Sequence, residues 1–324
     1  MQCAFRTVGF DAHETHESDT MPDWKTLART VLCLAHRYSG ALAMQEALAR
    51  SRGVRFMTIL LFHRVTDLTP EDGLTVSTQR FRRICRMLAS RFRVVPLAEV
   101  YRILRSGEEM PARTVAITFD DCYYDNLAAA RVLAEFGLPA TFFVPTGCVG
   151  TDKTFPWDAG RSRMPNLAWD DVREMARMGF EIGSHTVSHA NLGEVDREQA
   201  REELATSRAV LDRELGRPVR WFASPFGGPN DLRPEFMPLI RELGYEGAVS
   251  AFGGLVRPGM DDRVLPREAV PYFKSVSHLE VYLTGCLDWF YSLKEEVQTG
   301  RSRLPFGRQF RATPESPFDK VGAE

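Results

Sequence analysis

The strongest constraint on the fold is a regular alternation of short apolar runs with longer amphipathic segments, from Phe56 to Ala251. The short runs are typical of strands buried on both faces, and the amphipathic segments have helical spacing. The predicted strands are 56–63, 94–97, 114–121, 140–144, 180–185, 220–228 and 245–251, and the predicted helices are 77–92, 97–107, 126–137, 168–179, 196–216 and 234–244. This order predicts an α/β fold with a parallel sheet covered by helices, either doubly wound or a (β/α) barrel.

Several classes of function are not favoured by the sequence. Neither G-x-G-x-x-G opening a helix after a strand nor G-x-x-x-x-G-K-[ST] occurs, so the usual nucleotide cradles are absent. The formal net charge of −2 gives no electrostatic reason to expect nucleic acid as a partner. The six cysteines are scattered without a C-x-x-C pair, which favours free thiols in a reducing compartment.

The two ends of the chain are expected to lie outside the main domain, which we place at residues 53–296. Residues 1–52 start with a polar segment that lacks the pattern of a secretory signal, and then show apolar residues at helical spacing. We expect an amphipathic helix there, packed on the main domain or lying on a membrane surface as a peripheral anchor. Residues 297–324 are expected to be an irregular tail. No transmembrane segment is recognised, so we expect a cytoplasmic or membrane-peripheral protein; the sequence leaves its oligomeric state open.

Candidate metal ligands follow two of the predicted strands. Asp120 and Asp121 end the strand 114–121, and His185 and His189 stand four residues apart just past the strand 180–185. In both α/β architectures the chemistry lies beyond the carboxyl ends of the strands. Taken singly, the carboxylates could cap a strand end and the histidines could be surface residues. Together, two imidazoles and a carboxylate indicate a site for zinc, iron, manganese or cobalt.

The number of ligands indicates a catalytic site. Three protein ligands leave coordination positions open, whereas structural zinc sites are closed. One of the two aspartates would bind the metal, and the other would act as a general base toward metal-bound water.

These residues resemble the motifs of the polysaccharide deacetylases of carbohydrate esterase family 4. "TFDD" at 118–121 is similar to the first family motif, and "SHTVSH" at 184–189 is similar to the second. The resemblance implies a distorted (β/α) barrel that removes N-acetyl groups from a polysaccharide or glycolipid containing N-acetylhexosamine. It also implies Asp120 as the catalytic base and Asp121, His185 and His189 as ligands of a divalent ion. Zinc is the expected ion, with manganese, cobalt, nickel or iron as alternatives.

The third motif of the family is incomplete here. It would align on "ASPFG" at 223–227, with Ala223 where the family has an arginine. By resemblance, Pro225 and Phe226 form part of the substrate site, and the backbone N–H of Phe226 helps to hold the oxyanion. Another arginine would have to orient the base. Arg220 and Arg267 are the candidates, and we favour Arg267 because it follows an apolar, strand-like stretch.

The general acid is also out of its usual place. The family's L-x-H motif normally comes last, whereas here Leu61-Phe62-His63 ends the first predicted strand. This resembles the rearranged order of exopolysaccharide deacetylases that act on poly-β-1,6-N-acetylglucosamine, and it implies His63 as the catalytic acid. In a closed barrel the first strand can neighbour the last, so position around the ring matters more than chain order. The alternative is a buried histidine that bonds a backbone carbonyl.

Aromatic residues complete the expected site. Tyr124 and Trp157, with Trp169, could form a wall for sugar rings, although aromatic residues are also common in cores. The sequence thus predicts a metal-dependent deacetylase. Two alternatives stay open: an amidohydrolase of small amides, similar to allantoinases, and an inactive carbohydrate-binding relative, against which the intact metal ligands count.

Overall fold

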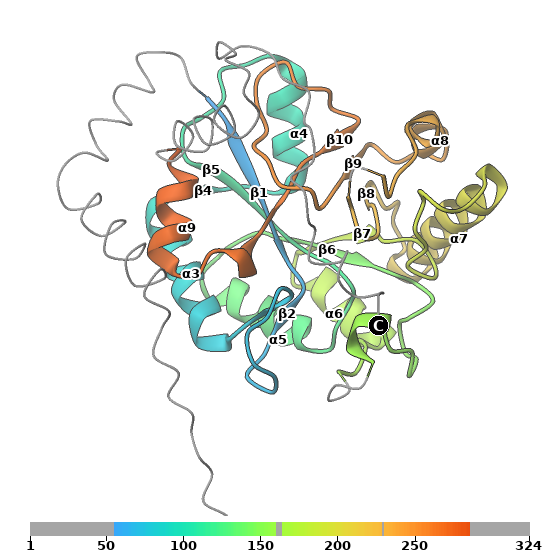
Figure 1. Cartoon of the computed structure of the whole chain (residues 1–324), viewed down its shortest axis with the longest axis horizontal. Coiled ribbons are helices and arrows are strands. Elements are labelled where there is room, and N and C mark those ends of the chain that lie inside the picture. The colour runs from blue at the N-terminus through green and yellow to red at the C-terminus, as the bar shows by residue number, and fades with distance from the viewer. Residues whose placement is uncertain (1–54, 160–163, 229, 286–324) are drawn as a thin grey trace, which may run out of the picture.

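The computed structural model describes residues 55–159, 164–228 and 230–285 of the 324-residue chain (Figure 1). At its centre lies a curled sheet, and helices surround it. The predicted N-terminal helix and the tail after residue 297 lie outside the described residues. The predicted boundaries of the main domain, at 53 and 296, fall outside them as well. Within the described ranges, no helix combines the length and the apolar composition needed to cross a bilayer.

The main sheet has nine strands, and every pairing in it is parallel. The strands follow the order β10-β9-β8-β7-β6-β5-β1-β11, and β4 pairs with the start of β5. Their bounds are β1 Met57–Phe62, β4 Arg93–Val94, β5 Thr114–Phe119, β6 Thr141–Val144, β7 Glu181–Ser184, β8 Trp221–Ala223, β9 Gly247–Val249, β10 Val264–Leu265 and β11 Glu268–Ala269. A separate parallel pair joins β2 (Arg64–Val65) to β3 (Thr75–Val76).

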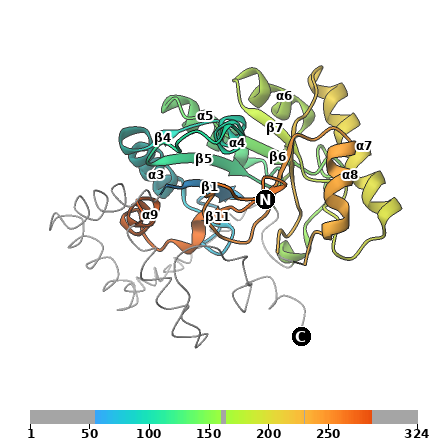
Figure 2. The ribbon, with the colours of Figure 1, turned by 90° about the horizontal axis from the view of Figure 1, so that it is seen from above.

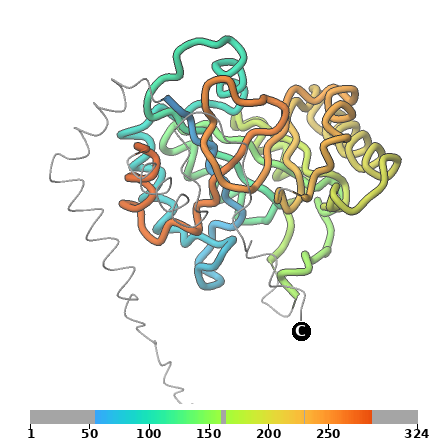
Figure 3. The backbone as a smooth tube through the Cα atoms, turned by 45° about the horizontal axis from the view of Figure 1, so that its top comes forward, coloured from blue at the N-terminus to red at the C-terminus, as the bar shows by residue number. Residues whose placement is uncertain are grey.

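The sheet curls into a half-barrel, which confirms the predicted barrel of distorted type. Its end strands β10 and β11 are not paired with each other in the described part of the chain. The first strand lies beside the last: Leu61 of β1 is in register with Ala269 of β11, and β5 flanks β1 on the other side. Figure 3 shows the orange segment that follows β9 passing beside blue β1. The first and last strands must be neighbours if an L-x-H motif on the first strand is to replace one that normally comes last.

Alternation along the strands produces two cores. Successive side chains of a strand point to opposite faces. In β1, Leu60 and Phe62 pack in the larger core under the helices, whereas Met57 and Ile59 pack in a smaller core inside the curl. The smaller core also contains Tyr101 and its apolar neighbours on α4 (Leu97–Ser106), so α4 fills the interior near the amino ends of the strands. The carboxyl ends are left for the site.

The remaining helices lie around the sheet, with α3 and α9 at one end and α7 and α8 at the other (Figure 2). Their bounds are α3 Thr78–Arg91, α5 Asp125–Glu135, α6 Trp169–Arg177, α7 Arg197–Leu215, α8 Met237–Glu242 and α9 Val276–Leu283, with 3-10 turns η1 Pro156–Asp158, η2 Pro234–Phe236 and η3 Val270–Tyr272. All six predicted helices are present. The strand predicted at 94–97 is shorter, because Pro96 has no N–H for a ladder and precedes the first residue of α4.

Candidate active site

The two adjacent aspartates follow β5, and the backbone turns sharply between them. The Asp120 N–H donates to Phe62 O at 3.0 Å, so Asp120 still continues the ladder with β1. Asp121 and Cys122 have φ angles of 75° and 54°, in the left-handed region that L-residues rarely occupy. Both carboxylates are buried. The turn directs them to different partners, which lets two like charges follow each other in sequence.

The structure brings Asp121, His185 and His189 together. Asp121 Oδ1 lies 3.4 Å from His185 Nε2 and 3.3 Å from His189 Nε2, and the three ligand atoms all lie within 4.8 Å of one another. His185 directly follows β7, where its N–H donates to Val144 O at 3.1 Å. His189 follows a loop in which Thr186 and His189 both have positive φ angles, of 63° each.

The hydrogen bonds of this cluster fit a cation. His185 Nδ1 lies 2.8 Å from Ala223 O, and a carbonyl can only accept, so Nδ1 carries the proton of the neutral imidazole. In this neutral form Nε2 presents a lone pair to Asp121 Oδ1, which is buried without a hydrogen-bond partner among the described residues. Two acceptors facing each other repel unless a positive charge lies between them. One oxygen and two imidazole nitrogens are a donor set that divalent transition metals accept.

Asp120 is held by Arg267 instead. Arg267 Nη1 and Nη2 donate to the two carboxylate oxygens at 2.8 and 2.6 Å, and both side chains are buried. Nε donates to Ser250 O at 2.6 Å, which orients the guanidinium plane. Burial alone would raise the pKa of Asp120, but the charge of Arg267, with smaller contributions from His185 and His63, brings this pKa below its usual value. The carboxylate is therefore kept ionised.

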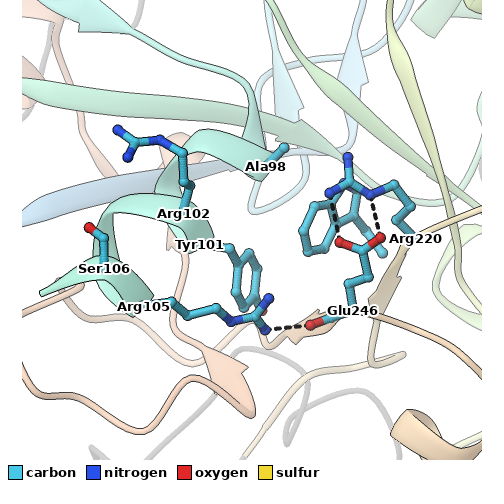
Figure 4. A pocket seen from close by; sticks show the side chains of 8 residues that line it. Ala98, Tyr101, Arg102, Arg105, Ser106, Arg220 and Glu246 are labelled. Carbon is cyan, nitrogen blue, oxygen red and sulfur yellow. Dashed lines mark hydrogen bonds and ion pairs between the residues drawn. The ribbon is translucent and has the colours of Figure 1, made fainter.

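This contact distinguishes Arg267 from Arg220, the other candidate. Arg267 lies between β10 and β11, the two end strands of the sheet, and its guanidinium reaches Asp120. Arg220 precedes β8 at the opposite end of the strands, where it pairs with Glu246 at 2.6 Å. That pair lines a separate cavity of about 450 Å³. Figure 4 shows the pair near Tyr101 and Arg105 of α4. Arg220 thus has no contact with the aspartates.

His63 lies at the carboxyl end of β1 and takes part in the electrostatics of the same cluster. Burial lowers its pKa; the charges of Asp121 and Asp120 act against this effect, and the net shift is downward. Its Nδ1 is buried without a hydrogen-bond partner in the described ranges. The alternative of a histidine that uses this nitrogen to bond a backbone carbonyl is therefore not what the structure has. Its role as the acid stays a prediction.

The "ASPFG" segment forms a tight turn after β8. The Gly227 N–H donates to Pro225 O at 2.6 Å, and Phe226 between them has φ 59°. No protein acceptor contacts the Phe226 N–H within the described residues, so this donor is available to a ligand. Among the described residues, five of the six non-glycine residues with positive φ lie in the three site loops: Asp121, Cys122, Thr186, His189 and Phe226. Backbone strain of this kind gathers at functional sites.

A cleft of about 230 Å³ opens beside His189. Phe226, Phe155, Lys153 and Cys148 are among the residues that line it. The predicted wall residue Trp157 lies next to this cleft, with its ring edge-on to His189 at 5.2 Å and to Phe226 at 5.9 Å.

The other two predicted wall residues are placed differently. Tyr124 is 55% exposed and does not line the cleft, whereas Trp169 is half-buried against the core under the helices. Their roles toward a sugar stay predictions. Cys85, Cys122 and Cys148 are buried free thiols, as expected from the cysteine spacing.

Sequence reasoning missed a group of buried polar residues beside the site. Arg64, Tyr123 and Asp158 are each 3% exposed or less and are bonded to one another. A signal was present for two of them, because Arg64 follows His63 and Tyr123 lies two residues past Asp121. Asp158 had no signal, since η1 is too short to show a period.

Comparisons with known proteins agree with this geometry. The profile of the family described as "Polysaccharide deacetylase" matches residues 107–248. Among curated proteins, YxkH of Bacillus subtilis is 25% identical over 200 residues, which are 61% of this chain and 65% of that protein. The peptidoglycan-N-acetylglucosamine deacetylase of Bacillus cereus is 29% identical over 132 residues, 40% of this chain and 42% of that protein. The chain therefore spans less than two thirds of the length of either relative.

The fold is shared with solved structures. The Streptococcus pyogenes deacetylase PplD, in complex with acetate, superposes with a TM-score of 0.59 at 24% identity, covering 69% of this chain and 96% of that one. The curled parallel sheet, with the Asp-Asp and His-x-x-x-His segments at its carboxyl edge, is the fold that this chain shares with that structure. Residues 107–248 form a domain of the polysaccharide deacetylase family, and the curated relatives and the shared fold support carbohydrate esterase family 4.

Proposed function

We propose that this chain is a metal-dependent hydrolase that removes N-acetyl groups from a glycan or glycolipid containing N-acetylhexosamine. The observation that carries the proposal is the convergence of Asp121 Oδ1 with two imidazole Nε2 atoms at 3.3 and 3.4 Å, beside the Asp120–Arg267 pair. The Bacillus cereus relative acts on N-acetylglucosamine in peptidoglycan, by its name, which supports this class of substrate.

The proposed ligands are Asp121, His185 and His189, with zinc as the favoured ion. One carboxylate oxygen and two imidazole nitrogens, close enough together to hold one ion, are a donor set that zinc accepts. Manganese, cobalt, nickel and iron are the alternatives that the test must include.

The proposed chemistry assigns one task to each residue. A divalent ion bound there would lower the pKa of a water molecule and polarise the acetamide carbonyl. Asp120, kept ionised by Arg267, accepts a proton from the attacking water; a carboxylate has lone pairs left after a bidentate contact. The Phe226 N–H donates a hydrogen bond to the oxygen that becomes negative. His63 gives a proton to the departing amine.

The test is acetate release by the purified chain. The protein is stripped with a chelator and reconstituted separately with zinc, manganese, cobalt, nickel or iron. It is then offered N-acetylglucosamine oligomers, a lipid-linked N-acetylhexosamine, and allantoin as the small amide. We expect acetate from one of the sugar substrates with zinc, and none from the stripped protein. Hydrolysis of allantoin alone would support the amidohydrolase alternative, and no reaction with any metal would overturn the proposal.

A further inference from the structure

A buried network of hydrogen bonds begins at Arg64, one residue past His63. Arg64 is 1% exposed, and its Nη2 donates to Asp72 Oδ2 at 2.9 Å. Its Nη1 donates to Asp158 Oδ1 at 2.5 Å, and the other oxygen of Asp158 accepts from Tyr123 OH at 2.6 Å. This network therefore joins three segments that are apart in sequence: β2, the turn after the two aspartates, and η1.

The hydroxyl of Tyr123 connects this network to Trp157, beside the site. The Tyr123 O–H donates its proton to Asp158, so the Tyr123 oxygen can still accept a hydrogen bond. Trp157 Nε1 donates to that oxygen at 2.9 Å. An indole N–H can only donate, and an ionised carboxylate can only accept. Donation therefore runs from Trp157 through Tyr123 to Asp158, and Arg64 donates to the same carboxylate. The indole is held in one orientation.

The orientation of Trp157 matters for the cleft beside the metal site. The indole stacks on Phe155 at 4.8 Å with the planes 7° apart, and it meets His189 and Phe226 edge-on. Phe155, His189 and Phe226 all line the cleft of about 230 Å³. Trp157 is thus packed against three lining residues at once, and a rotation of its ring would displace them.

We propose that Arg64, Asp158 and Tyr123 are positioning residues, which fix Trp157 and with it the aromatic wall of the cleft before a substrate arrives. The inference rests on the proposed function, because it takes the cleft as the place of the sugar. A wall that is ordered in advance lowers the cost of binding without taking part in bond breaking. Loss of this hydrogen-bond network should therefore raise KM and leave kcat nearly unchanged.

The first test is Tyr123→Phe, which removes one oxygen atom and keeps the ring. We expect KM for N-acetylglucosamine oligomers to rise about five- to tenfold, the effect of one hydrogen bond, with kcat within about twofold. The matched control is Tyr245→Phe, because Tyr245 is also buried and its hydroxyl donates to Leu204 O of α7 at 2.9 Å, not to the residues that hold Trp157. A KM that is unchanged in Tyr123→Phe, or a kcat that falls as much as KM rises, would overturn the proposal.

A double-mutant cycle tests whether Tyr123 acts through Trp157. In a Trp157→Phe background the indole N–H is gone, so adding Tyr123→Phe should change KM no further. Additive effects would show that Tyr123 acts by another route. Both variants keep an aromatic ring in place, and thermal unfolding identifies any member of the cycle that is merely destabilised.

A readout without substrate separates this inference from the proposed function. The tryptophan fluorescence of Trp157→Phe is subtracted from that of the native sequence, and quenching by acrylamide is measured on the difference. We expect Tyr123→Phe to make the Trp157 signal more accessible to acrylamide, and Tyr245→Phe to leave it unchanged. If the protein released no acetate from any sugar, the proposed function would fail. The quenching of the Trp157 fluorescence would still decide whether the hydrogen-bond network fixes Trp157. Equal quenching with and without the hydroxyl would overturn the inference.

Discussion

Arg267 and Asp120 form a buried, bidentate ion pair although 147 residues separate them in sequence. The pair forms because β1 lies between β5, which Asp120 follows, and β11, which Arg267 precedes. It supplies the cation that Ala223 cannot, since the arginine of the third family motif is missing from the chain.

Arg267→Ala should impair both stability and activity. The buried carboxylate would lose its partner, which costs about 3–5 kcal/mol of the free energy of unfolding. Without the guanidinium, burial would raise the pKa of Asp120. As a base Asp120 works only when ionised, so the acidic limb of the pH–rate profile should move to higher pH. Acetate release measured across pH checks this expectation, and an unmoved limb would contradict it.

Two further variants serve as controls for Arg267. Arg220→Ala removes a partly exposed ion pair with Glu246, which is worth about 0–1 kcal/mol, and should leave the pH profile unchanged. Ala223→Arg in the Arg267→Ala background returns an arginine to its position in the family motif. We expect it to recover part of the lost activity, and no recovery would indicate that the two positions are not equivalent.

His63→Ala should lower kcat by about 10²–10⁴ if His63 protonates the departing amine. The loss should be largest for substrates whose amine leaves poorly, and metal content should stay equal to that of the unchanged protein. His278→Ala is the matched control, because His278 lies on α9 and is not part of the site cluster. Equal kcat in both variants, determined by acetate release, would leave the site without an assigned acid.

The stability of the metal-free protein should depend on pH through His185. Burial lowers the pKa of His185, but the charges of Asp120 and Asp121 outweigh it and raise this pKa above the usual value. A raised pKa in the folded state contributes stability that is present below about pH 6.5 and is lost as pH rises through the folded pKa. Denaturant unfolding of stripped protein should therefore give a lower free energy at pH 9 than at pH 6, with all else equal. Added zinc should reverse this order, since the imidazoles bind metal in their neutral form.

Gly227→Ala should disturb the turn that presents the Phe226 N–H. Gly227 has φ 66°, and a Cβ there would lie 2.3 Å from Ala251 N. The segment must move to accept it, so we expect a loss of about 1–3 kcal/mol of stability and a fall in kcat larger than the change in metal content. Gly216→Ala is the control: its φ of 65° is equally left-handed, but a Cβ there meets nothing within 4 Å. It should lose stability alone.

The sequence was sufficient to predict the long elements and the residues at their ends. β1 and β5 are buried on both faces, and the capping box of Asp196 and Gln199 marks the start of α7. The two aspartates follow β5 directly, and His185 follows β7 with His189 four residues later, so the topology of a parallel sheet was enough to bring them to one edge.

Other features depend on contacts that a sequence pattern does not carry. β2, β3, β10 and β11 have two residues each, too few to show a period, and their pairing is set by neighbours distant in the chain. Arg267 was identified only as the better of two candidates, because nothing near it in sequence indicates Asp120. The hydrogen-bond network that links Arg64 to Trp157 is not predictable from the sequence, since its hydrogen bonds join three separate segments.

Comparison of Asp120→Asn with Asp121→Asn tests the central claim most directly. The measurement is acetate release from N-acetylglucosamine oligomers by zinc-reconstituted protein, with the bound zinc determined on the same sample. If Asp120 is the base and Asp121 a ligand, Asp120→Asn keeps its zinc and loses activity by about 10²–10⁴, whereas Asp121→Asn loses both. An Asp120→Asn protein that is fully active, or an Asp121→Asn protein that keeps all of its zinc, would contradict the assignment.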